Sequence, residues 1–197
     1  MNELWRKLQK KEWDLYLEQG PVGTFSVDGL KGAEMTGQII NNFIPHGYCL
    51  DVGCGALAYP SYMKAAPNVF FYGIDPYEGE ERDFHFEIGY AENLLFSDGE
   101  MDGVLFATSL DHVVDPVVAL EEAYRVLRCG GYLFIWTSLR SNNKKYQRWL
   151  AAEKPAQYDA YHMWAFTEKS LLELAKSFIF VEKVSVRKTE AIFIFKK

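Results

Sequence analysis

Short apolar runs recur along the middle of the chain, and helical or turn segments separate most of them. The runs lie at residues 48–52, 69–74, 84–88, 102–107 and 131–136. Runs of this length between turn-forming residues are typical of buried strands. Strands that alternate with helices favour right-handed crossovers and a mainly parallel sheet. The pattern therefore predicts an α/β domain.

The two ends of the sequence add further elements. Residues 2–19 carry an uneven apolar stripe that predicts a helix, and four glycines and a proline interrupt the pattern over 18–32. A second helix is expected over 31–43. Near the other end, apolar runs at 179–186 and 190–195 flank residues 187–189 and predict a hairpin. A hairpin that follows parallel strands places an antiparallel strand in the sheet.

Two helices have recognisable N-terminal signals. In the segment DPVVALEEAYRVLRCGG, Asp115 is a candidate N-cap and Pro116 suits the first turn. We expect this helix to end at Gly130, with Arg128 near its negative end. A later helix is expected to begin after Thr167, which is a second candidate N-cap.

Composition restricts the classes of function. The chain of 197 residues suits one domain, and its net charge of −6 comes without a block of basic residues. Nucleic acid is therefore not expected as the main partner. The start of the chain is charged and no apolar run reaches about 18 residues, so we expect neither a signal peptide nor a membrane span. Three cysteines without paired spacing indicate reduced thiols and a cytoplasmic location. Histidine and cysteine spacing typical of zinc is absent, so no metal site is expected.

The stretch CLDVGCGALAYP, residues 49–60, joins a strand to a glycine-rich turn. Gly53, Gly55 and Ala58 fit the pattern G-x-G-x-x-A. Asp75 follows at the end of the next strand, where an acid can accept hydrogen bonds from ribose hydroxyls. Three interpretations stay open for this turn: a nicotinamide dinucleotide, S-adenosylmethionine, or no ligand.

Three features favour S-adenosylmethionine. Asp51 stands two residues before Gly53, where its carboxylate can meet the positive amino-acid end of this cofactor, directly or through water. The same carboxylate would repel a pyrophosphate. The second feature is the motif that residues 89–116 supply. The third is that we expect no separate substrate domain after the hairpin.

These motifs resemble those of class I S-adenosylmethionine-dependent methyltransferases of the type 11 group. LDVGCG resembles the first motif, GIDPY the second-strand motif, AENLLFSDGEMDGVLFATSLDHVVDP the third and fourth strands, and EAYRVLRCGGYLFIWT the following helix and fifth strand. The resemblance implies a Rossmann-like, doubly wound, mainly parallel seven-stranded sheet with an antiparallel last strand. Residues 1–46 would form a helical cover, 47–197 the cofactor-binding domain, and 138–166 an insertion that acts as a lid.

The resemblance also implies site residues by position. Those for the cofactor are Asp51, Gly53 and Gly55 at the methionine end, Asp75 at the ribose hydroxyls, Pro76 and Tyr77 beside ribose and adenine, Ala91 and Glu92 beside adenine, and Ala107, Thr108 and Leu110 below the sulfonium. Two positions depart from the family pattern. Leu57 stands where the family often has a third glycine, and Tyr90 where it often has an aspartate that receives the adenine amino group.

Two histidines are candidate general bases, which the reaction needs only if the acceptor still carries its proton. His112 lies in SLDHV at the carboxyl end of the fourth strand, where α/β sheets place ligands. The alternative is that it packs under the cofactor. His162 lies in an aromatic stretch that forms either an acceptor wall or part of the core. The N-terminal segment contains the aromatic residues Trp5, Trp13, Tyr16 and Phe25. They either cover the site or dock a helix on the sheet edge.

The sequence thus predicts a cytoplasmic enzyme, a monomer or homodimer, that methylates an oxygen or nitrogen of a small molecule. A sugar or another polar metabolite is the expected acceptor. One alternative is a non-enzymatic protein of the same fold that has kept the cofactor. The other is a nicotinamide-dependent oxidoreductase.

Overall fold

The computed structural model describes residues 3–19, 32–140 and 161–197. Its elements, in chain order, are α1 Glu3–Gln19, α2 Gly32–Phe43, β1 Gly47–Val52, α3 Ser61–Lys64, β2 Val69–Asp75, β3 His85–Ile88, β4 Met101–Ala107, the short 3₁₀ helix η2 Leu110–His112, α4 Pro116–Val126, β5 Leu127–Ser138, α6 Glu168–Leu174, β6 Ile179–Arg187 and β7 Glu190–Lys196.

One seven-stranded sheet organises the domain, with the order β3-β2-β1-β4-β5-β7-β6. The pairs among β1 to β5 are parallel, whereas β7 runs antiparallel to both β5 and β6. The predicted doubly wound sheet with an antiparallel last strand is therefore confirmed. From β1 the chain continues to β2 and β3 on one side, and it then crosses to β4 on the other side of β1. Ligands of such sheets bind outside the carboxyl ends of the strands at this switch point.

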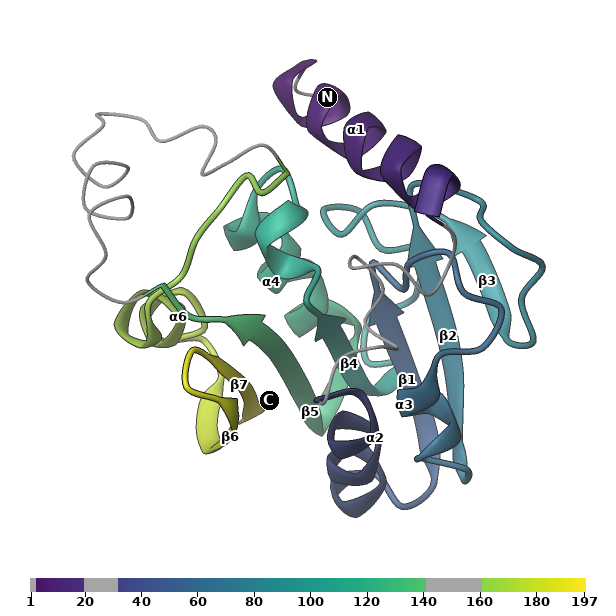
Figure 1. Cartoon of the computed structure of the whole chain (residues 1–197). Coiled ribbons are helices and arrows are strands. Elements are labelled where there is room, and N and C mark those ends of the chain that lie inside the picture. Colours follow the sequence, from purple (N-terminus) through teal and green to yellow (C-terminus); the bar gives the residue numbers. More distant parts are fainter. Residues whose placement is uncertain (1–2, 20–31, 141–160) are drawn as a thin grey trace.

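Helices cover both faces of the sheet (Figure 1). On one face, Ile40 of α2 and Met63 of α3 are fully buried against the sheet. On the other face, Leu120 of α4 and Leu171 of α6 are buried. Burial of each such side chain stabilises the fold by about 1.5–3 kcal/mol. The two layers leave the carboxyl ends of the strands uncovered, and Figure 1 shows α1 lying across that end of the sheet.

Both predicted N-caps are confirmed. The Asp115 carboxylate accepts a hydrogen bond from the Val117 N–H at 2.9 Å. Thr167 and Ser170 form a reciprocal capping box at the start of α6. Each satisfies backbone donors that have no partner within the helix, which is worth about 1 kcal/mol.

The predicted end of α4 was wrong. The helix stops at Val126, and Leu127 is already extended (φ −67°, ψ 134°) because it pairs with Met101 of β4. Gly130 lies in β5 at φ +79°, near a register shift of the β4–β5 pair, and does not close the helix. Arg128 forms an ion pair with Asp102 instead of lying at a helix terminus.

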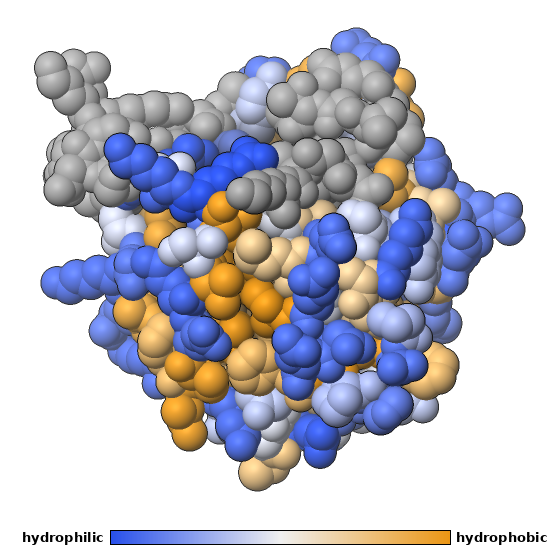
Figure 2. Space-filling view, turned by 60° about the horizontal axis from the view of Figure 1, so that its bottom comes forward, coloured by the Kyte–Doolittle hydropathy of each residue, from blue (hydrophilic) through white to orange (hydrophobic). Residues whose placement is uncertain are grey.

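The surface mixes apolar and charged side chains. On the side seen in Figure 2, apolar residues reach the surface among hydrophilic ones. Two large apolar side chains of the sheet, Phe70 and Ile179, are each about two-thirds exposed. Among the described residues, no helix has both the length and the apolar character that crossing a membrane requires.

Candidate active site

A cavity of about 440 Å³ opens at the carboxyl ends of β1, β2 and β4. Its volume lies within the range of about 300–1,000 Å³ that small-molecule sites occupy. The sequence-predicted residues that line it are Gly53, Gly55, Asp75, Pro76, Tyr77, Ala91, Glu92, Ala107, Thr108, His112 and His162. Two predicted residues, Asp51 and Leu110, are not part of its lining.

The glycine turn needs glycine at Gly53 for two reasons. Its φ of +75° suits glycine, and a Cβ there would lie only 2.6 Å from the Cβ of Ser109. Gly55 also has a positive φ of +71°, but a Cβ at this position would meet no atom within 4 Å. Gly55 therefore leaves open space beside the cavity. Leu57 does not have a positive φ, so its departure from the family pattern puts no strain on the turn.

Asp75 holds the glycine turn against the end of β2. One carboxylate oxygen accepts from the Gly55 N–H and the other from the Tyr77 N–H, both at 3.0 Å. Burial raises the pKa of Asp75 to about 6, against the lowering effect of these hydrogen bonds. A carboxylate has about four lone-pair positions, so Asp75 keeps capacity for further donors such as ribose hydroxyls.

A second clamp on the turn comes from the segment after β2. The Arg82 guanidinium donates to the carbonyls of Gly55 at 2.6 Å and Ala56 at 3.3 Å. The Glu80 carboxylate accepts from the Ala58 N–H at 3.2 Å. Neither residue was predicted from the sequence, because nothing in their spacing distinguishes them from surface charges.

Asp51 is fully buried beneath the site and does not line the cavity. Its Oδ2 accepts a hydrogen bond from the hydroxyl of Tyr62, a lining residue, at 2.5 Å. Within the described part of the chain, Oδ1 has no hydrogen-bond partner. Burial raises the pKa of Asp51 to about 7. Asp51 was expected to contact a ligand directly or through water; it is not part of the cavity lining, so the contact through water is the one that stays a prediction.

Two more predicted residues have structural partners. Leu110, the first residue of η2, is 1% exposed and packs in the core. The Glu92 carboxylate lines the cavity, but its Oε1 already accepts from the backbone N–H groups of Val114 at 2.7 Å and Asp115 at 3.0 Å. Glu92 thereby fixes the loop between η2 and α4.

Thr108, at the end of β4, has a left-handed backbone with φ +59°. This conformation is costly for a β-branched residue. Its N–H donates to the Trp136 carbonyl at 2.8 Å, and the Ser109 hydroxyl donates to the Val52 carbonyl. These two bonds hold the strained turn, which directs the chain from β4 past the cavity.

Helix α1 covers the cavity, and five of its residues line it: Trp5, Gln9, Glu12, Trp13 and Tyr16. The Trp13 ring stacks on Tyr77, with ring centroids 4.8 Å apart and an interplanar angle of 8°. The Trp5 ring contacts the Tyr90 ring edge-on, at 5.7 Å. Helix α1 thus forms part of the cavity wall, and the N-terminal cover over residues 1–46 stays a prediction. Phe25 lies outside the described residues, as does most of the predicted 138–166 lid.

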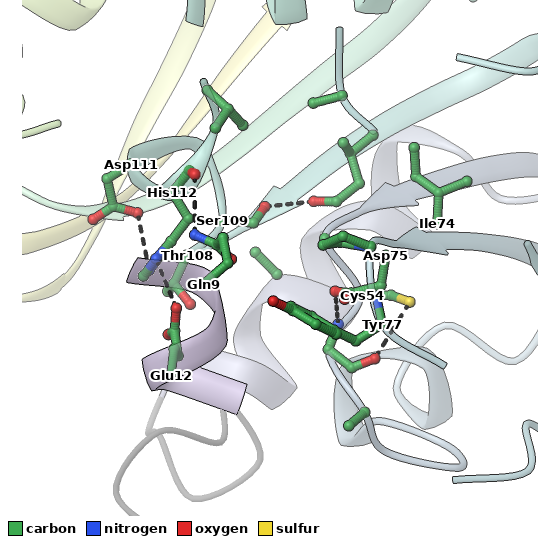
Figure 3. A pocket seen from close by; sticks show the side chains of 18 of the residues that line it. Gln9, Glu12, Cys54, Ile74, Asp75, Tyr77, Thr108, Ser109, Asp111 and His112 are labelled. Atoms are coloured by element: carbon green, nitrogen blue, oxygen red, sulfur yellow. Dashed lines mark hydrogen bonds and ion pairs between the residues drawn. The ribbon is translucent and has the colours of Figure 1, made fainter. Parts of the chain in front are cut away.

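The two candidate bases lie together on the side of the cavity next to η2. The rings of His112 and His162 are 4.7 Å apart between centroids. Glu12 of α1 approaches His112, with 3.0 Å between Oε2 and Nδ1 (Figure 3). Asp111 lies beside both imidazoles. Asp111 was not predicted as a site residue, although it adjoins His112. Nothing in the sequence connects Glu12 with these residues.

The sequence also matches a known family. Residues 50–135 match the family model described as a methyltransferase domain. They hold the glycine turn, Asp75 and η2. This central part of the chain is therefore a methyltransferase domain.

Solved methyltransferase structures share the fold over nearly the whole chain. The 1,6-didemethyltoxoflavin N1-methyltransferase of Burkholderia thailandensis, solved with 1,6-didemethyltoxoflavin and S-adenosylhomocysteine, has a TM-score of 0.75 at 16% identity, over 100% of this chain and 90% of that one. A possible histamine N-methyltransferase of Thermotoga maritima has a TM-score of 0.62 at 21% identity, over 98% and 97%. A methyltransferase of Aquifex aeolicus has a TM-score of 0.63 at 16% identity, over 94% and 97%. No relative among the curated proteins matches the sequence.

The residues of this methyltransferase fit its cofactor, S-adenosylmethionine. Gly55 leaves room beside the cavity, and Asp75 has lone pairs for hydroxyl donors. The Oδ1 of Asp51, which has no hydrogen-bond partner within the described residues, is a buried acceptor, and Oδ2 of the same carboxylate accepts from Tyr62. An unsatisfied buried acceptor is costly, and a cationic group or a water bound nearby would relieve that cost.

Proposed function

We propose that this methyltransferase transfers the methyl group to an oxygen or nitrogen of a small polar acceptor, such as a sugar or another polar metabolite. The observation that carries the proposal is the cluster around His112 and His162, which shares one cavity with the glycine turn. The Burkholderia structure, which holds a small heteroaromatic molecule in the same fold, supports a small acceptor. We further infer a cytoplasmic monomer or homodimer that does not use nucleic acid.

The chemistry requires little from the protein beyond alignment and exclusion of water. The bound cofactor supplies a methyl group on a sulfonium. In the transfer, the methyl–sulfur bond breaks, a methyl–oxygen or methyl–nitrogen bond forms, and a proton leaves the acceptor. His112 and His162 lie where they can take that proton. Helix α1 shields the reacting atoms from water by covering the cavity.

The contacts with the cofactor follow from the cavity wall. We place its ribose hydroxyls on the Asp75 carboxylate and its adenine near Tyr77 and Ala91. The methionine end lies over Gly53 and Gly55. Its amino group reaches Asp51 through Tyr62 or a water, because Asp51 itself lies under the wall.

Calorimetric titration with S-adenosylmethionine, S-adenosylhomocysteine and NAD tests the cofactor assignment. Binding of both adenosyl ligands without NAD is the expected result. NAD binding alone would contradict it and revive the oxidoreductase alternative. Release of S-adenosylhomocysteine from a panel of small polar acceptors then tests the acceptor class. Tight cofactor binding with no turnover on any acceptor would favour the non-enzymatic alternative.

A further inference from the structure

Four side chains with metal-ligating atoms meet beside the cavity: Glu12, Asp111, His112 and His162. One ligand atom from each of Asp111, His112 and His162 lies within 4.8 Å of the other two. Asp111 Oδ1 is 3.8 Å from His112 Nε2, and Asp111 Oδ2 is 3.9 Å from His162 Nε2. These separations are close to those between neighbouring ligands of one metal ion, given metal–ligand distances of about 2.0–2.2 Å.

Hydrogen bonds outside the cluster hold its members in place. The Asp111 carbonyl accepts from the N–H groups of Met163 and Trp164, both at 3.0 Å, which fixes the segment that carries His162. The Trp164 indole donates to the Val113 carbonyl at 2.9 Å. On the other side, the Trp5 indole donates to the His112 carbonyl at 2.6 Å. Three distant parts of the chain therefore meet in a preformed arrangement.

Glu12 lies where a supporting carboxylate of a metal site is found. Its Oε2 faces Nδ1 of His112 at 3.0 Å, while Nε2 of the same ring faces Asp111 (Figure 3). A carboxylate on one ring nitrogen favours the proton there and leaves the other nitrogen as the ligand atom. Metal-bound histidines are commonly oriented in this way.

We propose that Asp111, His112 and His162 bind one divalent transition-metal ion, with Glu12 orienting His112. Two imidazole nitrogens with one carboxylate suit Zn²⁺, Fe²⁺ or Co²⁺ better than Mg²⁺ or Ca²⁺, which prefer oxygen ligands. A second observation supports an ion here. Asp111 is 7% exposed, and its Oδ1 accepts no hydrogen bond from the described residues. A cation would satisfy this buried oxygen.

The ion would define the acceptor class, and this step rests on the proposed function. Three protein ligands leave coordination positions open, and all three line the cavity. The acceptor is then a molecule with two neighbouring oxygen or nitrogen atoms that chelate the ion. A hydroxyl bound to the ion loses its proton more readily. In this arrangement the histidines would hold the ion, and the proton of the bound acceptor would pass to solvent water instead of to a free histidine.

Titration of the chelator-treated full chain with Co²⁺ tests the site without any turnover. Visible d–d absorption reports the ligand field, and calorimetry with Zn²⁺ reports stoichiometry. We expect one ion per chain. His162→Ala and Asp111→Asn should each weaken binding at least tenfold, and Glu12→Gln about 10–100-fold. His85→Ala is the matched control, because His85 also faces a carboxylate, Glu87 at 3.1 Å, but does not line this cavity.

Thermal unfolding and S-adenosylhomocysteine binding of each variant separate loss of the ion from loss of the fold. Binding of Co²⁺ and Zn²⁺ that is no weaker in His162→Ala and Asp111→Asn than in His85→Ala would overturn the inference, as would no binding in the folded parent chain. Loss of the metal site with intact S-adenosylhomocysteine binding would leave the proposed function standing. If the parent chain binds the metal ion but binds no adenosyl ligand, the proposed function is wrong.

Discussion

The buried carboxyl of Asp51 predicts a specific dependence of stability on pH. Burial raises its pKa from the ordinary value of 3.8 to about 7. A group whose pKa is raised in the folded state binds its proton more tightly there than in the unfolded chain. Stability therefore falls as pH rises between about 4 and 7, at up to about 1.4 kcal/mol per pH unit. Over the roughly three units involved, the ionised carboxylate costs about 4 kcal/mol above pH 7 and nothing below pH 4.

Asp51→Asn removes this dependence. The amide can still accept from Tyr62, but its NH₂ group would replace Oδ1, which has no hydrogen-bond partner within the described residues. That exchange costs about 1–3 kcal/mol at every pH. The variant should therefore be less stable than the parent near pH 4 and as stable or more stable above pH 7.

Denaturant unfolding of both unliganded proteins between pH 4 and 9 measures the difference. Burial raises the pKa of Asp75 to about 6, so Asp75 adds its own pH dependence to the stability of both proteins. The difference between the two proteins therefore reports Asp51, together with the repulsion between Asp51 and Asp75. Tyr62→Phe is the companion variant. It removes the hydrogen bond that lowers the pKa of Asp51, so the fall in stability should extend to higher pH. A stability difference between parent and Asp51→Asn that stays constant from pH 4 to 9 would refute the reasoning.

Three further predictions, made with four substitutions, have defined outcomes. Asp75→Ala should weaken S-adenosylhomocysteine binding by about 1–3 kcal/mol in calorimetry through lost ribose hydrogen bonds, and unchanged affinity in folded protein would remove Asp75 from the site. Trp13→Ala should lose a stacked pair worth about 0.5–1.5 kcal/mol and raise hydrogen exchange in α1, whereas unchanged exchange would show that the stack does not hold the cover. Gly53→Ala should lower the melting temperature more than Gly55→Ala, because only the former clashes with Ser109. Gly55→Ala should mainly weaken cofactor binding. A larger fall in melting temperature for Gly55→Ala than for Gly53→Ala would contradict these roles of the two glycines.

Local patterns predicted most of the strands and the glycine turn well, because most strands contain an apolar run next to turn-forming residues. The end of α4 was missed because pairing of Leu127 with β4 outweighs the local preference for helix up to Gly130. The burial of Asp51 also follows from packing that no local pattern records. The cluster around His112 could not be predicted from the sequence for another reason. Glu12 is 100 residues away from His112 in the sequence, and His162 is 50, so only the fold brings them together.

The position of β7 in the sheet has a consequence for folding of the chain during its synthesis. This strand is the last of the sheet in chain order, yet it lies between β5 and β6. Its alternating residues enter both cores, with Phe193 and Phe195 on one face and Ile192 and Ile194 on the other. During synthesis, β6 therefore emerges before β7, the strand that it pairs with in the described part of the chain, and neither hydrophobic core is complete until β7 follows. A nascent chain stalled before residue 190 would expose β5 and β6 as open edges, which are templates for aggregation.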